Sequence, residues 1–93
     1  MKLLVFSVFD VAVKAFGTPF YARTKGEALR GFSQACNNRE HEFFKHAPDF
    51  QLFELGEFDD STGFVVCQSP VRVIGALECL VGDEVVPLRS VKS

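Results

Sequence analysis

Residues 3–9 form the most apolar segment of the chain, and they are apolar at both alternating sets of positions. One set is Leu3, Val5 and Phe9, and the other is Leu4, Phe6 and Val8. Successive side chains of a strand point to opposite faces, so this strand would be covered on both sides. We therefore expect it at the centre of a sheet.

A second strand is predicted over residues 15–23, after a turn at residues 10–14. Gly17 and Pro19 interrupt this strand and are typical of a bulge or of a sheet edge. The segment is also dense in aromatic and basic side chains, which bears on function below.

The sequence Thr24-Lys-Gly-Glu27 is a capping box, in which the Thr24 hydroxyl accepts from the Glu27 amide and the Glu27 side chain reaches back. It predicts a helix over residues 24–37, which Asn37-Asn38 ends. The apolar stripe of this helix consists of Ala28, Leu29, Phe32, Ala35 and Cys36. Residues 40–46 add a helical turn that brings Phe43 or Phe44 to the core, and Pro48 closes it.

Two further strands are predicted at residues 50–58 and 64–68, joined by the turn-forming residues 59–63. Ser69-Pro70 is typical of an N-cap followed by the first helical position. A second helix is therefore predicted over Pro70–Val81. Its apolar stripe consists of Val73, Ile74, Leu77, Leu80 and Val81, and Gly82 would end it.

Together these elements predict an α+β fold for a single domain spanning residues 1–93. A small, mainly antiparallel four-stranded sheet, in the order β-β-α-β-β, carries the helix of residues 24–37 on one face. The other face would be covered by the helix Pro70–Val81, by a second subunit, or by both. Residues 85–93 add a short strand or a frayed end.

Aromatic content changes this picture, because eleven Phe are present in only 93 residues. Each covered Phe buries roughly 150–250 Å², and a chain of this size buries only about 60–65% of its unfolded surface. A monomer can hardly cover so many rings, so we expect a self-association or binding surface that carries aromatics. We predict a homodimer.

Charge is unevenly distributed along the chain, although the net charge is only −2 and the pI is near 5.6. Residues 1–46 carry seven bases and four acids, whereas residues 47–93 carry three bases and eight acids. An acidic chain does not coat nucleic acid through charge alone. The basic half either faces a phosphate backbone or attracts the acidic half within a dimer, and both explanations stay open.

Three cysteines, Cys36, Cys67 and Cys79, are an odd number at wide spacing, which favours reduced thiols in a cytoplasm. Lys2 and the apolar run after it resemble a signal peptide, but the run stops at Asp10 without a small-residue cleavage site. No stretch reaches the roughly 20 apolar residues that a membrane helix needs. We expect a soluble, intracellular protein with no membrane partner.

Neither a metal site nor a catalytic site is predicted. The spacing of His41 and His46 fits half of a zinc site, yet no paired cysteines complete it, and solvated helix-end histidines are the simpler interpretation. Cys36 lies on the apolar stripe as a small hydrophobe rather than as a thiol partner of His41. Asp59-Asp60 fits a solvated hairpin tip. We expect no cofactor and no enzyme activity.

Residues 14–25 interleave bases with aromatics on a predicted strand, as single-stranded nucleic-acid binding requires. Aromatic rings stack on the bases, and cations follow the backbone phosphates. The candidate nucleic-acid-binding residues are Lys14, Phe16, Tyr21, Arg23, Lys25 and Arg30. Phe20 and Tyr21 point to opposite faces, so at most one of them is buried against the helix. The alternative interpretation is a core hairpin strand with solvated basic ends.

Several short motifs occur in a distinctive order along a chain of this length. They are Phe6-Ser-Val-Phe-Asp10, Phe16-x-x-Pro19-Phe20, Glu27-Ala28-x-Arg30-x-Phe32, Asn37-Asn38, His46-x-Pro48-x-Phe50-x-Leu52 and Leu55-Gly56-x-Phe58-Asp59-Asp60. With them the chain resembles the small nonstructural protein of gokushovirus-type microviruses, which are tailless phages with single-stranded DNA genomes. From Phe64 onward the resemblance is weak.

The resemblance implies a nonstructural protein in the cytoplasm of the bacterial host, absent from the mature virion. Members of that family are described as DNA-binding, or as accessory to single-stranded genome synthesis and packaging. Our first hypothesis is a non-enzymatic accessory protein that engages single-stranded DNA or the replication machinery. The alternative is an oligomeric adaptor whose aromatic surface binds a viral replication, procapsid or host factor, with no nucleic-acid contact.

Overall fold

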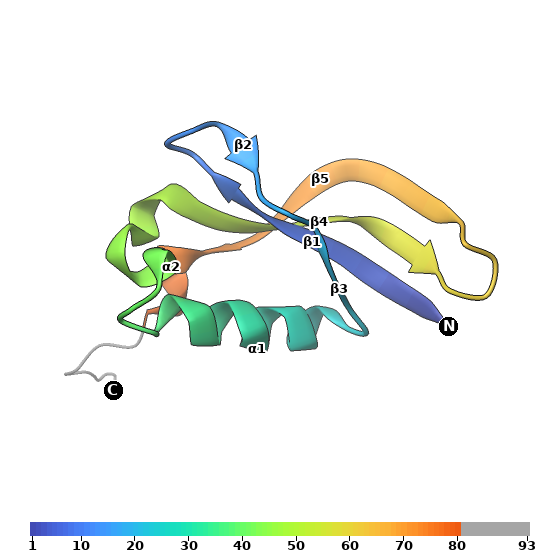
Figure 1. Cartoon of the computed structure of the whole chain (residues 1–93), viewed down its shortest axis with the longest axis horizontal. Helices are drawn as coiled ribbons and strands as arrows, with labels where there is room; N and C mark the ends of the chain where they lie inside the picture. Colours follow the sequence, from blue (N-terminus) through green and yellow to red (C-terminus); the bar gives the residue numbers. More distant parts are fainter. Residues whose placement is uncertain (81–93) are drawn as a thin grey trace.

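The structure is a computed structural model that describes residues 1–80 of the chain. The strand or frayed end expected at residues 85–93, and the helix-ending Gly82, lie outside the described residues. The elements in chain order are β1 (Lys2–Asp10), β2 (Ala15–Phe16), β3 (Phe20–Ala22), α1 (Lys25–Cys36), α2 (Glu42–Lys45), the 3₁₀ turn η1 (Ala47–Asp49), β4 (Phe50–Asp59), β5 (Val65–Gly75) and α3 (Ala76–Cys79). The predicted α+β class is confirmed (Figure 1).

The strands form one antiparallel sheet in the order β2-β1-β4-β5, with β3 also paired to β1. The apolar first strand is central, as predicted. The predicted second strand is present as two short pieces, β2 and β3, on the same edge of β1, because Gly17 to Pro19 breaks the pairing between them. The break is anchored to β1, since the Gly17 N–H donates to the Val8 carbonyl at 2.8 Å and the Ser7 hydroxyl donates to the Gly17 carbonyl at 2.7 Å.

Helix α1 begins with the predicted cap. The Thr24 hydroxyl accepts from the Glu27 N–H at 3.1 Å, and the Glu27 carboxylate accepts from the Arg23 N–H at 2.6 Å. Asn37 is the C-cap, as expected. The side chains that α1 presents to the sheet form the core together with residues of β1, β3, β4, η1 and α3. The buried core cluster consists of Phe6, Ala22, Ala28, Phe32, Cys36, Ala47, Phe50, Leu52 and Ala76.

The helical turn after α1 is also confirmed, and it is Phe43 rather than Phe44 that packs against the core. The Phe43 ring lies 5.5 Å from the Phe32 ring and 4.7 Å from the Phe50 ring, measured between centroids. Residues 59–63 make the predicted tight turn between β4 and β5. There the Asp59 carboxylate accepts from the Ser61 N–H and hydroxyl, and Gly63 has a φ of 81°.

A short C-terminal helix is confirmed, but the predicted start at Pro70 is wrong, and the predicted end at Val81 lies outside the described residues. Residues 70–75 of the predicted helix belong to β5, and among residues 76–80 the helical part is the single turn of α3. The stripe of Val73, Ile74 and Leu77 fits helical spacing, but β-branched side chains favour a strand where a partner strand is available. The strand β4 is that partner, with Leu52 opposite Ile74. Pro70 is tolerated because it lies in a bulge on a strand at the sheet edge.

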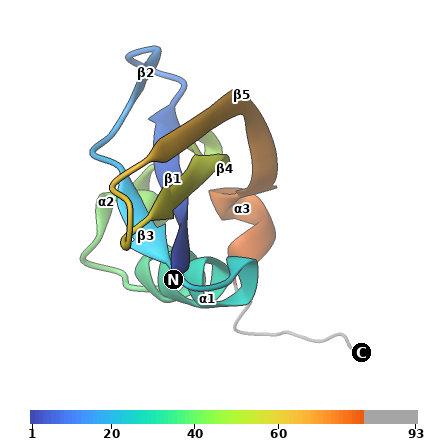
Figure 2. The same cartoon turned by 90° about the vertical axis from the view of Figure 1, so that its right-hand side faces the viewer.

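Consequently α3 does not cover the second face of the sheet. It packs beside α1, where Ala76 enters the core and the Asn37 side-chain amide donates to the Cys79 carbonyl at 2.9 Å. Figures 1 and 2 show α1 on one side of the sheet, while β2 and β5 rise on the other. We call the side away from α1 the outer face. No helix within residues 1–80 covers it, and none is long and apolar enough to span a membrane.

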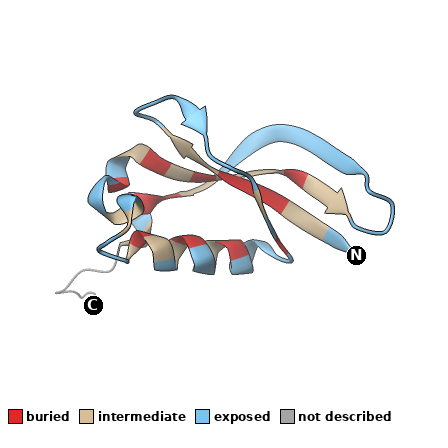
Figure 3. Cartoon of the chain, in the orientation of Figure 1, coloured by how far each residue is buried: buried red, intermediate tan, exposed pale blue. Residues whose placement is uncertain are grey.

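Burial follows this layering. Figure 3 shows the buried residues between α1 and the sheet, while the first part of β5 is exposed. Strand β4 carries a bulge at Leu55, after which Gly56 faces β5 with a φ of 157°. A Cβ on Gly56 would run into the Val66 carbonyl oxygen, so only glycine fits where these strands approach.

Candidate nucleic-acid interface

Strand pairing decides which side chains share the outer face, because residues directly opposite one another point to the same side of a sheet. Phe9 pairs with Phe16, Ser7 with Phe53, and Val5 with Tyr21. Following the register across the sheet, the outer-face residues are Leu3, Val5, Ser7, Phe9, Phe16, Tyr21, Gln51, Phe53, Gly56, Phe58, Val65, Cys67 and Arg72. Five of them are aromatic.

Three rings meet at one end of the outer face, and we call them the Phe16 cluster. The Phe9 and Phe16 centroids are 4.8 Å apart, Phe16 and Phe53 are 5.4 Å apart, and Phe9 and Phe53 are 6.0 Å apart. Tilted and edge-on rings at these separations attract one another and hold a fixed arrangement. Phe16 remains exposed, so the cluster presents aromatic surface to solvent.

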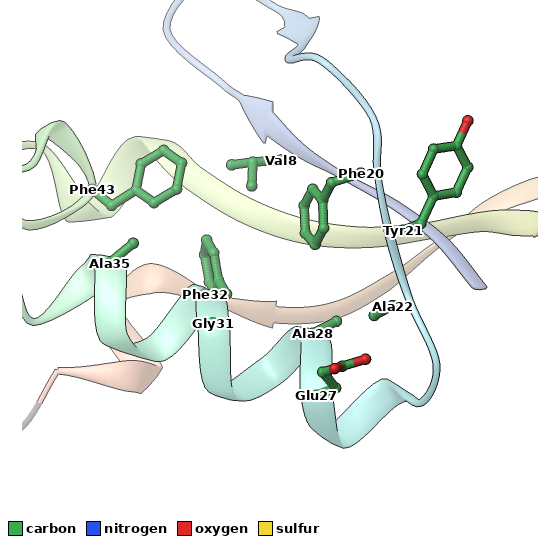
Figure 4. A pocket seen from close by; sticks show the side chains of 10 residues that line it. All are labelled: Val8, Phe20, Tyr21, Ala22, Glu27, Ala28, Gly31, Phe32, Ala35 and Phe43. Carbon is green, nitrogen blue, oxygen red and sulfur yellow. The ribbon is translucent and has the colours of Figure 1, made fainter. Parts of the chain in front are cut away.

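Tyr21 and Phe58 form a second aromatic group, the Tyr21 pair, with centroids 5.7 Å apart. Tyr21 is 57% exposed. Figure 4 shows its ring pointing away from α1, whereas the ring of Phe20 points toward the helix and stacks on Phe6 at 5.9 Å. The prediction that at most one of these two neighbours is buried against the helix is confirmed, since Phe20 is half-buried there and Tyr21 is exposed.

Along β1 the two groups are separated by the four-residue step from Val5 to Phe9, which is about 13 Å at strand spacing. Between them Val5 and Ser7 are buried at the floor of the outer face. The outer face thus offers two separated aromatic platforms on one rigid sheet.

The charges of the sheet are sorted between its faces. None of the outer-face residues is acidic, whereas the acidic residues of the strands are all in register with the α1 side: Asp10, Glu54, Glu57 and Asp59. Arg72 is the cation on the outer face of the described sheet, and it bonds the Glu78 carboxylate at 2.9 Å and Gln51 at 3.3 Å. An anion approaching the aromatic platforms therefore meets no carboxylate from the strands.

The structure brings some of the predicted binding residues together and separates others. Phe16 and Tyr21 both lie on the outer face. Lys14 is exposed in the turn just before β2, and Arg23 and Lys25 are exposed where β3 joins α1. In the chain these bases therefore flank the segment that carries Phe16 and Tyr21.

Arg30 does not join the other predicted binding residues. It lies on the exposed side of α1, midway in sequence between the buried residues Ala28 and Phe32. The helix therefore separates it from the outer face of the sheet.

Sequence reasoning missed Phe9, Phe53 and Phe58. They belong to strands far apart in the sequence, and only the pairing register places them beside Phe16 and Tyr21. The alternation of residues 3–9 did separate Phe9 from Phe6, but it did not say which set would face the helix.

A groove of about 390 Å³ lies between β3 and α1, on the other side of the sheet from Tyr21's ring (Figure 4). Aromatic side chains converge on it, with Phe20, Phe32 and Phe43 among its walls. Its helical wall consists of small residues: Ala28, Gly31 and Ala35. A second hollow of about 220 Å³ shares Val8 and Phe43 with it and continues beneath β2.

The remaining reactive residues have structural surroundings. Cys36 is fully buried, and burial raises the pKa of its thiol to about 12, so it is a poor nucleophile. The ring nitrogen Nδ1 of His41 accepts from the Phe43 N–H at 3.0 Å and caps α2. Within residues 1–80 no cluster of three potential metal ligands is found.

The chain matches the model of a known protein family. A family model described as "Phage ORF5 protein" matches residues 3–79, which runs from β1 to α3. Searches of curated proteins and of solved structures found no significant match.

Proposed function

The chain belongs to the phage ORF5 protein family, and we propose that it is a non-enzymatic, nonstructural accessory protein that engages single-stranded DNA through the outer face of its sheet. In this proposal it acts as a homodimer in the cytoplasm of the bacterial host, during genome synthesis and packaging of a microvirus-type phage. It contacts replication or procapsid proteins in that cytoplasm and is absent from the mature virion.

The observation that carries the proposal is the outer face itself. Two aromatic groups stand about 13 Å apart on a face without strand carboxylates. Every nucleobase offers a flat surface for stacking, and such stacking contributes about 1–3 kcal/mol per base. Exposed aromatic rings on a rigid sheet otherwise destabilise a soluble protein by inviting aggregation, so a binding role explains their exposure.

The bases fit a supporting role. Lys14 comes two residues before Phe16, and Arg23 and Lys25 follow Tyr21 where β3 joins α1, so in this proposal a strand stacked on both groups meets these three cations at its ends. The acidic residues of the strands belong to the other face and repel the phosphates less. Arg30, on the far side of α1, takes no part.

The test is fluorescence anisotropy of a labelled single strand of about 20 nucleotides at several salt concentrations. Three neutralised phosphates predict a log–log salt dependence of about −2 for a single strand. If the protein binds the strand at none of the salt concentrations, the proposal is excluded.

A matched pair of variants locates the site. Phe16→Ala with Tyr21→Ala removes one ring from each aromatic group and should weaken binding at least about tenfold, given the stacking energy per base. Leu77→Ala removes an apolar side chain from α3 that is also 57% exposed, and it should leave binding unchanged. Equal losses in both variants would place the contact elsewhere.

The groove between β3 and α1 favours a second function, that of a protein adaptor. Within residues 1–80 β3 pairs only with β1, so its other edge is open beside the groove, and an extended peptide would add there as a strand while its apolar side chains enter the groove. Gly31→Leu would fill the groove, because no atom lies within 4 Å of a Cβ at Gly31. If the adaptor function is correct, this variant loses a viral replication or procapsid partner in pull-down while DNA binding persists.

A further inference from the structure

Strand β5 presents the most exposed apolar surface of the described chain. Its first eight residues are exposed, and beside them Phe64 is 71% exposed (Figure 3). Val65, Val66 and Val71 are each more than half exposed. Residues 61–71 contain no charged side chain, in a chain of which 24% is charged. Within residues 1–80 this strand pairs only with β4, so its other edge is open.

The hydrogen-bond pattern identifies the backbone groups that face away from β4. The Phe64 carbonyl accepts from the Asp59 N–H at 2.9 Å, so Phe64 faces β4. Backbone groups alternate in direction along an antiparallel strand. The N–H and C=O groups of Val66 therefore also point toward β4, whereas those of Val65 and Cys67 point away from β4, toward the open edge. The open edge therefore offers two N–H groups and two carbonyls within three residues.

We propose that two copies of the chain pair through this edge, antiparallel, about a two-fold axis at Val66. Val65 then lies opposite the partner's Cys67, and the four outward groups of each copy are satisfied together in one short ladder. Phe64 and Val66 lose exposed apolar surface as the strands meet. The bulge that contains Pro70 ends the ladder on one side, and the turn at Gly63 ends it on the other.

A second copy is the occupant that the charges favour. Open sheet edges usually carry Lys or other charges that prevent pairing, and this segment carries none. An uncharged strand meets its own copy without like-charge repulsion. The pairing uses the same edge in both copies, so it closes at two subunits rather than growing into a fibre. The ladder is short, so the dimer is reversible and depends on concentration.

This arrangement has a consequence for the outer face. A two-fold axis perpendicular to the sheet keeps both outer faces on the same side, so the aromatic groups of both copies would lie on one continuous surface. The consequence for DNA rests on the proposed function, but the interface does not.

The interface is tested by sedimentation equilibrium over a range of concentrations. The unchanged protein should dimerise reversibly, and Val65→Lys should weaken the dimer at least tenfold, because a charge on the edge opposes pairing. Val65 is 58% exposed, so its replacement should leave the monomer folded, and circular dichroism checks this. Val13→Lys is the matched control, since Val13 is 67% exposed in the turn between β1 and β2. A protein that stays monomeric at every concentration overturns the proposal.

Hydrogen exchange locates the contact independently. The amides of Val65 and Cys67 should exchange more slowly as the concentration rises, and this change should vanish in Val65→Lys. The amide of Val66 faces β4 and should be protected at every concentration. A dimer that forms without slowing Val65 and Cys67 uses another surface and also overturns the proposal. A dimer that binds no DNA would leave this inference standing and exclude the proposed function instead.

Discussion

The two faces of the sheet are made by the same strands but contain different chemistry. On the side of α1, Phe6 and Leu52 are fully buried beneath the helix. On the outer face, Phe16 lies opposite Phe9 and Tyr21 lies opposite Val5, and both rings remain exposed. The strand acids are in register with the first face and absent from the second. Position within the two-residue repeat therefore decides whether an aromatic ring supports folding or is available for binding.

This difference teaches that stability and binding can be changed separately in this molecule. A fully buried side chain such as Phe6 cannot contact a ligand unless the helix moves, and an outer-face ring adds little to the core. Substitutions on the two faces should therefore give opposite outcomes in unfolding and in binding experiments.

The largest contrast is expected between Phe6→Ala and Phe16→Ala. Phe6 is fully buried in the core cluster, so its truncation leaves a cavity and should lower the free energy of unfolding by about 3–5 kcal/mol. Phe16 is exposed and packs against the rings of Phe9 and Phe53, so its truncation should cost less than about 1.5 kcal/mol. Urea unfolding of both variants measures the difference. Similar losses would contradict the division between the faces.

Two glycines give the next contrast. Gly56→Ala places a Cβ against the Val66 carbonyl at the bulge of β4, so it should destabilise the protein by about 1–3 kcal/mol through overpacking and backbone strain. Gly31→Ala meets no atom within 4 Å on α1 and should stabilise the protein by up to about 1 kcal/mol. Thermal unfolding followed by circular dichroism distinguishes these outcomes, and a tolerated Gly56→Ala would mean that the bulge can relax.

Local sequence signals predicted the elements whose stability is local or whose pattern has one solution. The central position of β1 followed from residues 3–9 being apolar at every position except Ser7. The capping box and Asn37 predicted both ends of α1. The second strand was predicted as one piece with a bulge or an edge at Gly17 and Pro19, and the structure instead divides it there into β2 and β3.

The failures involved information that is not local. The apolar spacing of residues 70–81 predicts a helix, and only the availability of β4 as a partner favours a strand over residues 70–75. For the same reason the candidate site was predicted in part. Phe16 and Tyr21 came from a single segment, whereas Phe53 and Phe58 join them through cross-strand register.

The cap of α1 provides a smaller test of what the helix contributes to the covered face. Thr24→Ala removes the side-chain oxygen that accepts from the Glu27 N–H, which should cost about 1 kcal/mol of unfolding free energy. The first turn of α1 should fray, so hydrogen exchange there should accelerate while exchange in β1 and β4 changes little. Thr62→Ala, in the β4–β5 turn, is the control for loss of a threonine hydroxyl. Faster exchange throughout the sheet would mean that both faces depend on the cap.

The smallest effect is expected where a charge pair joins β5 to α3. Arg72 bonds the Glu78 carboxylate and holds its pKa below the ordinary value of 4.5. A carboxyl group with a lowered folded-state pKa adds stability above the ordinary pKa and loses it as the pH falls through the lowered value. Glu78→Gln should therefore lower the urea midpoint slightly at about pH 7, and this effect should shrink as the pH falls below the ordinary pKa of 4.5. Both side chains are half exposed, so added salt should shrink the difference. Glu40→Gln, which removes an exposed carboxylate elsewhere, is the control variant. A Glu78→Gln effect that persists at low pH would mean that Glu78 acts through its bond from the Gly75 N–H, and hence through the geometry of α3 rather than through charge.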